Sequence, residues 1–190
     1  MNEQSAAYDT IVVGGGPSGA TAANDLARSG HKVLLLERGF RIKPCGGAIP
    51  PCLMAEFDIP EHLLVARIRS ARMVSPRGEA VDMPIDGTYV GMVDRDEFDP
   101  WLRERARKSG ADVVAGVFKS LRYVDDRIEL TYQTKDDNPR VMTVTARSVI
   151  GSDGARSAVA RATIPDAEKT PWGLAYHEII EVPDDHNWAA

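Results

Sequence analysis

The chain has 190 residues, of which 43% are hydrophobic and 27% charged, an ordinary globular composition with enough length for one sizeable core. A net charge of -5 gives no basic surface of the kind that binds nucleic-acid phosphates, so a nucleic-acid partner is excluded. With no secretory leader and no apolar run of about 18 residues, the sequence predicts a cytoplasmic protein whose membrane contact would be peripheral. In that compartment Cys45 and Cys52 stay reduced, and without nearby histidines they indicate no metal site.

The first forty residues predict a strand, a glycine-rich turn, a helix and a second strand. Tyr8–Val13 is a short apolar run, as expected of a strand buried on both faces of a parallel sheet. The helix predicted over Pro17–Ser29 has proline in its first turn and a small, alanine-rich interior, and Gly30 ends it. Lys32–Glu37 supplies the second buried strand, so the segment is a βαβ unit.

The next fifty residues break this alternation and predict an insertion. Arg38–Pro60 is rich in Gly and Pro and is expected to be an irregular loop with a short helix over Cys52–Phe57. Turn residues then separate three short strand-like segments, which together predict an antiparallel β-meander. These segments are Arg67–Val74, Glu79–Met83 and Thr88–Val93.

An amphipathic helix and a second group of strands follow the insertion. The helix is predicted over Asp96–Ser109, with Gly110 as its end. Its apolar face consists of Phe98, Trp101, Leu102 and Ala106. The later strands are predicted over Ala111–Phe118, Arg127–Gln133, Val141–Ala146 and Ser148–Gly151. The whole order predicts an α/β fold, a Rossmann-like domain with a parallel sheet and an inserted antiparallel region.

Residues 14–19, with the sequence GGGPSG, fit the pattern G-x-G-x-x-G between the first strand and the first helix. Gly14 permits the tight turn, Gly16 lets the backbone approach a pyrophosphate, and Gly19 lets the helix lie close to the strand. The phosphates would bind free amides at the positive end of the helix. The other residues of this loop are Gly15, Pro17 and Ser18.

An acid near the expected spacing strengthens this motif. Glycines also occur in ordinary turns, so the pattern alone is weak evidence. Glu37, however, ends the next strand, where a carboxylate can bind the ribose hydroxyls of a dinucleotide. The strand, the glycine turn, the helix and the acid together predict a dinucleotide site.

Three features favour FAD over a nicotinamide dinucleotide. The glycine motif lies at the extreme amino terminus, a long insertion interrupts the βαβ pattern, and residues 149–157 (VIGSDGARS) place an Asp-Gly turn before a short helix. The last feature resembles the Gly-Asp motif of flavoprotein hydroxylases and their relatives, which implies that Asp153, with Gly154, contacts the ribityl chain of the flavin. The alternative for Asp153 is a turn residue that caps the helix.

The same flavoprotein family implies two further contacts. It has an arginine before its first long helix, in a pattern like residues 93–99 (VDRDEFD), which implies that Arg95 helps to hold the flavin. The alternative is that Asp96 caps the helix and Arg95 is solvated. Phe118 matches a position whose backbone often meets the adenine in such folds.

The loop at residues 41–51 (RIKPCGGAIPP) resembles the geranylgeranyl reductase family, especially its photosynthetic branch, in which a Pro-Cys-Gly-Gly turn lies beside the flavin ring. Further stretches resemble the same family, so the resemblance covers nearly the whole chain: residues 58–66, 70–75, 82–87, 90–95 and 175–180. Paired glycines beside a flavin would let the ring and a flat alkene approach the backbone. The cofactor contacts expected in this region are Arg38, Cys45, Gly46, Gly47 and Ala48.

This resemblance implies an FAD-dependent oxidoreductase that saturates the isolated double bonds of a geranylgeranyl chain to a phytyl chain, with NADPH as the electron donor. The prenyl substrate would be the free diphosphate or the chain esterified to chlorophyll or bacteriochlorophyll, and contact with photosynthetic membranes would be peripheral. Hydride would pass from the flavin to one alkene carbon while an acid protonates the other. Cys45 is either the acid or a polarizable part of the pocket wall, and a free cysteine is more often a small buried apolar residue.

The resemblance also implies that the chain is the amino-terminal part of a protein about twice as long. Within one domain, residues 1–40 and 90–165 would form the FAD-binding part, and residues 41–89 and 166–190 the substrate side. His177 is more often a hydrogen-bonded polar residue in such a position, and acid–base catalysis is its alternative role. Five basic residues either attract a diphosphate or form a solvated face: Arg41, Lys43, Arg67, Arg69 and Arg72. The rival functions are a flavin-dependent aromatic hydroxylase and a non-catalytic FAD-binding fragment.

Overall fold

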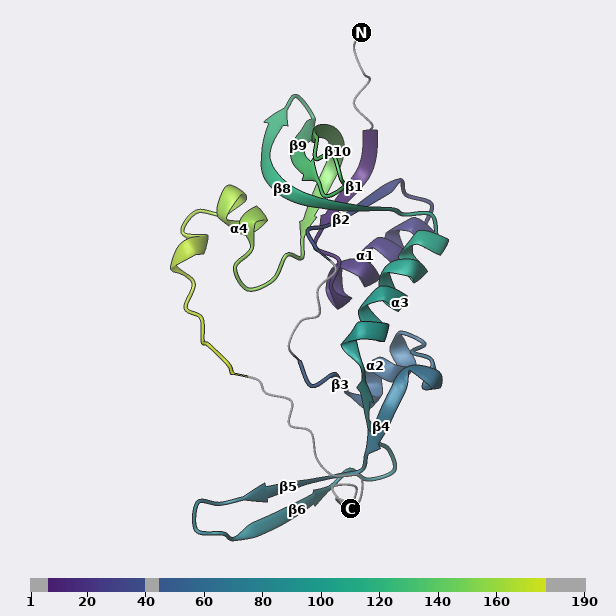
Figure 1. The fold of residues 1–190 in the computed structure, drawn as a ribbon, viewed down its shortest axis with the longest axis vertical. Coiled ribbons are helices and arrows are strands. Elements are labelled where there is room, and N and C mark those ends of the chain that lie inside the picture. Colours follow the sequence, from purple (N-terminus) through teal and green to yellow (C-terminus); the bar gives the residue numbers. More distant parts are fainter. Residues whose placement is uncertain (1–6, 40–44, 177–190) are drawn as a thin grey trace.

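A mixed sheet of five strands, closed into a barrel, forms the centre of the fold (Figure 1). The structure is a computed structural model that describes residues 7–39 and 45–176. β1 (Ala7–Val13) lies between β2 (Val33–Glu37) and β10 (Val141–Gly151) and is parallel to both. β8 (Asp112–Val124) is parallel to β2, and β9 (Arg127–Thr134) pairs antiparallel with β8 and β10. The predicted parallel βαβ sheet is confirmed.

Two helices, α1 (Pro17–Arg28) and α3 (Arg95–Lys108), pack against each other on one face of this sheet (Figure 1). Ala20 and Ala23 of α1 are fully buried, so the small residues predicted for this helix do allow a close approach. Phe98, Leu102 and Ala106 of α3 are buried as predicted. These two helices therefore cover the layer from which the site is built.

β1 and β2 are buried on both faces because alternate side chains of a strand point to opposite sides. Val12 and Leu35 pack with the helices. Ile11 and Leu34 point the other way and pack with Leu130 of β9. This two-sided burial explains why both strands read as continuous apolar runs.

The insertion between β2 and α3 forms two small antiparallel sheets, one with the strand order β3-β7-β4 and one with β5 and β6. Its elements are β3 (Ala48–Ile49), α2 (Pro51–Glu56), a 3-10 turn at Glu61–Leu63, β4 (Leu64–Ile68), β5 (Ser70–Val74), β6 (Ala80–Pro84) and β7 (Val90–Val93). The predicted short helix and the antiparallel character of the insertion are confirmed.

The pairing order of these strands differs from that of the predicted meander. The segment Arg67–Val74, predicted as one strand, is divided at Arg69. Its first part pairs with β7 and its second part with β6, and the Ile85 amide joins the two regions by donating to the Arg69 carbonyl at 2.8 Å. Asp86 and Gly87 are turn residues between two of the predicted strands, but they do not reverse the chain, because β6 runs antiparallel to β5 and β7 runs antiparallel to β4.

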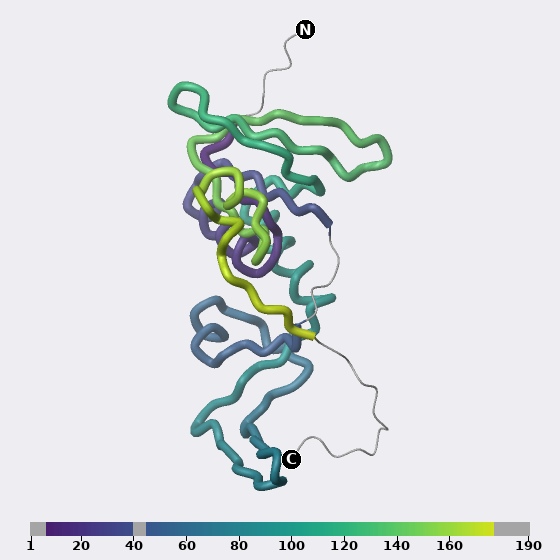
Figure 2. The backbone as a smooth tube through the Cα atoms, turned by 90° about the vertical axis from the view of Figure 1, so that its left-hand side faces the viewer, coloured from purple at the N-terminus to yellow at the C-terminus, as the bar shows by residue number. Residues whose placement is uncertain are grey.

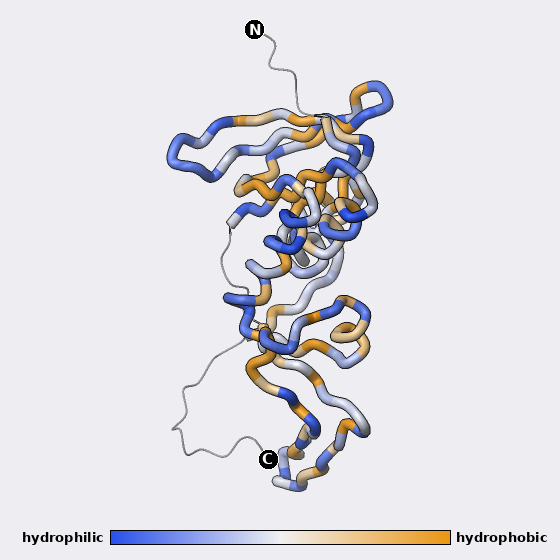
Figure 3. Tube along the Cα trace, turned by 90° about the vertical axis from the view of Figure 1, so that its right-hand side faces the viewer, coloured by the Kyte–Doolittle hydropathy of each residue, from blue (hydrophilic) through white to orange (hydrophobic). Residues whose placement is uncertain are grey.

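The hairpin of β5 and β6 extends away from the barrel to the far end of the molecule (Figures 1 and 2). All residues of its two strands are exposed. One face carries the apolar side chains of Met73, Val81 and Met83, and the opposite face carries the ion pair of Arg72 and Asp82. Apolar and polar residues therefore alternate along this end of the chain in Figure 3.

The end of the described chain contains shorter elements. The two strands predicted over Val141–Ala146 and Ser148–Gly151 are the single strand β10, and β8 continues past Phe118 to Val124. The short helix predicted after the Asp-Gly turn is α4 (Ala158–Thr163), and a 3-10 turn follows at Ala167–Lys169. Within residues 7–39 and 45–176, no helix has both the length and the apolar character needed to cross a membrane.

Candidate functional site

The glycine loop, residues 14–19, joins the carboxyl end of β1 to the amino end of α1. Gly14 has a φ of +106°, and a Cβ atom there would lie 2.3 Å from the Ser152 carbonyl oxygen, so no other residue fits. A Cβ atom on Gly19 would lie 1.8 Å from the Gly14 carbonyl oxygen because the first turn of α1 packs directly on the loop. The tight turn and the close packing predicted for these two glycines are both confirmed.

The first turn of α1 offers backbone amides to an anion. Gly16 is its N-cap residue, and no side chain caps the helix there. Pro17 occupies the first turn, as predicted. Uncapped amides at the positive end of a helix bind phosphate groups. This donor set fits a dinucleotide pyrophosphate, and the contacts of Gly16, Pro17 and Ser18 with it stay predictions.

Glu37 lies at the end of β2 and holds the glycine loop in place. Its Oε2 atom accepts a hydrogen bond from the Gly15 amide at 2.6 Å, and its Oε1 atom accepts one from the Gly39 amide at 2.9 Å. The carboxylate therefore orders the loop. The predicted ribose contact itself stays a prediction.

A small cavity of about 120 Å³ lies beside Gly14. It brings together four residues that the sequence singled out separately: Glu37, Arg38, Phe118 and Asp153. Glu37 ends β2 and Arg38 follows it, Phe118 lies in β8, and Asp153 follows β10. The cavity therefore lies at the carboxyl ends of parallel strands. Ligands of open α/β sheets bind at that edge.

Asp153 caps α4 in this structure. Its Oδ2 atom accepts a hydrogen bond from the Ala158 amide at 2.6 Å, and its Oδ1 atom accepts one from the Ser157 hydroxyl. The cap that was the alternative interpretation is thus present, and the ribityl contact stays a prediction. Gly154, the next residue, is exposed.

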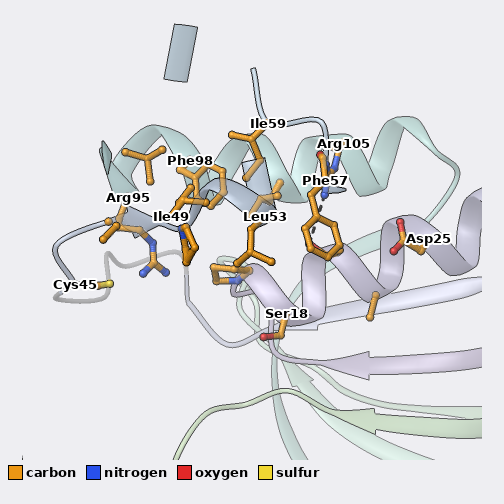
Figure 4. A pocket seen from close by; sticks show the side chains of 18 residues that line it. Ser18, Asp25, Cys45, Ile49, Leu53, Phe57, Ile59, Arg95, Phe98 and Arg105 are labelled. Atoms are coloured by element: carbon orange, nitrogen blue, oxygen red, sulfur yellow. Dashed lines mark hydrogen bonds between the residues drawn. The ribbon is translucent and has the colours of Figure 1, made fainter. Parts of the chain in front are cut away.

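A large cavity of about 540 Å³ lies on the other side of the glycine loop, between α1, α2, α3 and the segment 45–50 (Figure 4). Pro17 and Ser18 of the loop line one side of it. Much of its wall is apolar and includes Ile49, Leu53, Phe57, Ile59, Phe98 and Leu102. The predicted contacts Cys45, Gly47, Ala48 and Arg95 also line it.

Cys45 and Arg95 lie at the same end of the large cavity (Figure 4). Cys45 is exposed, which contradicts the alternative of a buried apolar residue. The Arg95 side chain is only 10% exposed and binds Asp99 twice, with Nε–Oδ1 and Nη2–Oδ2 distances of 2.7 and 2.8 Å. The two bonds to Asp99 raise the pKa of Arg95. Arg95 is therefore not the solvated side chain of the alternative interpretation.

The two glycines after Cys45 have different surroundings. Gly46 is exposed, whereas Gly47 is buried with a φ of +71°. A Cβ atom on Gly47 would lie 2.0 Å from the Val93 carbonyl oxygen, and the Val93 amide donates to the Gly47 carbonyl at 3.0 Å. The requirement for glycine at position 47 thus comes from contact with β7, and the expected approach of a ligand is not needed to explain it.

Two buried charged residues of α3 belong to the site but were not predicted. Asp99 and Arg103 are 6% and 8% exposed. Arg103 donates from Nη1 to the Gly15 carbonyl at 3.2 Å. Burial lowers the pKa of Arg103, while the charges of Asp99 and Glu37 act in the opposite direction. The signal in the sequence was the spacing of four between charged residues 95, 99 and 103, beside the apolar face of the helix.

The basic residues considered for a diphosphate are largely paired within the insertion. Arg67 binds Glu61 at 3.1 Å and Arg72 binds Asp82 at 2.6 Å. Arg69 lies 5.6 Å from the ring centre of Tyr89.

Arg41, Lys43 and His177 lie outside the described residues, so their expected roles stay predictions. Cys52 is a free cysteine and is exposed on α2.

Two sequence profiles of known families match the chain. A profile described as FAD dependent oxidoreductase matches residues 9–49, and one described as FAD binding domain matches residues 58–176, which is more than half of the chain. The chain belongs to the FAD binding domain family. This membership supports FAD as the cofactor.

Curated relatives of this family member include geranylgeranyl diphosphate reductases. That of Rhodobacter capsulatus is 53% identical over 176 residues, which are 93% of this chain and 44% of the relative. The chloroplastic enzyme of Arabidopsis thaliana is 39% identical over 185 residues, 92% of this chain and 39% of the relative. The predicted resemblance is confirmed, and the chain spans less than half the length of these relatives.

Solved structures show the same fold. A geranylgeranyl bacteriochlorophyll reductase-like protein from Thermoplasma acidophilum matches with a TM-score of 0.76 at 26% identity, over 85% of this chain and 43% of that protein. The aromatic hydroxylase CabE matches with a TM-score of 0.64 at 27% identity, over 83% and 33%. The predicted flavoprotein fold is confirmed, and this aromatic hydroxylase is the more distant of the two.

Proposed function

We propose that FAD binds across the glycine loop, with its adenosine in the small cavity and its flavin in the large one. The observation that carries this proposal is the position of the loop between the two cavities. Gly14 lines the small cavity, and Pro17 and Ser18 line the large one. The uncapped amides of α1 lie between them, where they would bind the pyrophosphate.

The residues around each cavity suit the part of the cofactor assigned to it. The Glu37 carboxylate would accept hydrogen bonds from the hydroxyl groups of the adenosine ribose. Asp153, next to Gly14 of the loop, would accept them from the ribityl chain of the flavin. Phe118 would meet the adenine, with Arg38 beside it. At the flavin end, Arg95 and Cys45 are among the polar groups that line the large cavity, and Gly46 and Ala48 are exposed along the same segment as Cys45.

The activity that these features support best is reduction of a prenyl chain by the longer protein to which the chain corresponds. We propose that this protein saturates the isolated double bonds of a geranylgeranyl chain, carried by a diphosphate or a chlorophyll-type pigment, with NADPH as donor. Bound FAD supplies the hydride chemistry. The high identity to the Rhodobacter capsulatus reductase supports this substrate class.

The chain's own residues would position the alkene and handle the proton. The apolar wall of the large cavity would exclude water from a prenyl segment. Cys45 stands exposed at its end, next to Arg95, and is the candidate proton donor. We assign the barrel, α1 and α3 to the FAD-binding part (residues 1–40 and 90–165), and residues 41–89 and 166–190 to the substrate side.

A chimera tests the activity. The chain replaces the matching part of the Rhodobacter capsulatus relative, and the product is incubated with geranylgeranyl diphosphate and NADPH. Saturated prenyl products are expected, at a lower rate in a Cys45→Ser chimera. Peroxide formation stimulated by a phenol, without alkene reduction, would support the hydroxylase instead. FAD retention with no turnover by the chimera, when the intact relative is active, would support a non-catalytic fragment.

A further inference from the structure

A row of three buried charged residues runs along one side of α3, at positions 95, 99 and 103. The row begins at the end of the large cavity that Arg95 and Cys45 both line, and it reaches the glycine loop, where Arg103 binds the Gly15 carbonyl. Asp99 stands in the middle with its side chain 8% exposed. One face of α3 thus connects the Cys45 end of the large cavity with the glycine loop, the two regions assigned to FAD.

Stability does not explain why charges are buried here. A buried ion pair repays little of the free energy lost on desolvation, and apolar residues of similar size often stabilise a protein as well or better. Apolar side chains would suffice to pack α3 against α1, as Phe98 and Leu102 already do on the neighbouring face. The buried charges are better explained by the groups that they position, which are the Arg95 side chain and the glycine loop.

Asp99 fixes the orientation of Arg95. Both carboxylate oxygens are used, one on Nε and one on Nη2, which sets the plane of the guanidinium group. Arg95, held in this way, lines the large cavity at the same end as Cys45 (Figure 4). Without Asp99, the long side chain of Arg95 would be free to rotate away.

We propose that Asp99 is a positioning residue of the FAD site, which acts by holding Arg95 against the flavin end of the cofactor. This inference rests on the FAD site proposed above. It predicts that loss of Asp99 weakens the binding of FAD but not of ADP, which has the adenosine and the pyrophosphate and lacks the flavin. A residue that merely stabilised the fold would affect both ligands.

The test compares Asp99→Asn with Asp96→Asn, a control on the same helix. Asp96 is exposed, so the same change of charge is made without loss of the contact to Arg95. Isothermal titration of the 190-residue chain should show FAD affinity about tenfold lower in Asp99→Asn, the effect of a lost hydrogen bond to a charged group. ADP affinity should be unchanged, and Asp96→Asn should bind both ligands like the wild type.

A double-mutant cycle shows whether Asp99 acts through Arg95. In an Arg95→Gln background, Asp99→Asn should cause no further loss of FAD affinity. Equal FAD affinities for Asp99→Asn and Asp96→Asn would overturn the inference, as would a full effect of Asp99→Asn in the Arg95→Gln background. Failure of the wild type to bind any FAD would instead refute the proposed function.

A second readout does not need FAD. In a Cys52→Ser background, the rate at which iodoacetamide alkylates Cys45 should change by roughly threefold or more on Asp99→Asn, because a cation held near a thiol affects its reactivity. The change should vanish with Arg95→Gln and should be absent in Asp96→Asn. An unchanged rate would show that Asp99 does not hold Arg95 at Cys45, and would overturn the inference even if FAD is not bound.

Discussion

Gly19 shows how tightly single residues constrain the site. Replacing glycine by alanine inside a helix normally stabilises a protein by about 0.5–1 kcal/mol. Here the added Cβ atom would meet the Gly14 carbonyl oxygen at 1.8 Å, so we expect Gly19→Ala to lower the free energy of unfolding by about 1–3 kcal/mol. Urea denaturation measures this change in the free energy of unfolding. The control is Gly173→Ala, where the added Cβ atom meets open space. A stabilised Gly19→Ala variant would contradict this packing.

Tyr8 makes stability depend on pH at the alkaline end. Burial raises the pKa of Tyr8 above its ordinary value, and a hydrogen bond to Asp112 at 3.0 Å raises it further. Above pH about 10 the unfolded tyrosine loses its proton while the folded one keeps it, so stability falls as pH rises. Tyr8→Phe should make this fall shallower, without abolishing it, because burial also raises the pKa of Tyr132. Parallel stability curves from pH 9 to 11 for wild type and variant would contradict the prediction.

Among the elements, the hairpin of β5 and β6 is the one that we expect can be removed without unfolding the barrel. A two-stranded ribbon is marginally stable alone, and its base is closed by the hydrogen bond between the Ile85 amide and the Arg69 carbonyl. We expect that replacing residues 70–84 with a short glycine linker leaves the barrel folded and FAD binding unchanged. Circular dichroism and FAD titration check this. Loss of FAD binding in a folded variant would place the hairpin in the cofactor site.

The sequence predicted some elements well because their determinants are local. β1, α1 and β2 follow from two apolar runs, a glycine motif and a small-residue helix, all within one short segment. The pairing of the insertion depends on Asp86 and Gly87 looping out, which local turn chemistry does not reveal. The need for glycine at position 47 arises from Val93, far along the chain. Asp99 and Arg103 were missed because charged residues on an amphipathic helix usually face solvent.

For the whole molecule, the central claim is that the chain binds FAD across the glycine loop. The two cavities on either side of the loop support it, as does membership of the FAD binding domain family. A side chain at Gly16 would occupy the space that the pyrophosphate needs, whereas loss of the Glu37 carboxylate removes hydrogen bonds worth about 1.5–3 kcal/mol each. Gly16→Val should therefore impair binding more than Glu37→Ala.

The most direct measurement is a titration of the purified chain with FAD, followed by quenching of flavin fluorescence. We predict saturable binding by the wild type, weaker binding by Glu37→Ala and no detectable binding by Gly16→Val, with all three variants folded by circular dichroism. The same titration with Gly173→Val, where a Cβ atom meets open space, serves as the control. Equal FAD binding by the wild type and a folded Gly16→Val variant would contradict the account.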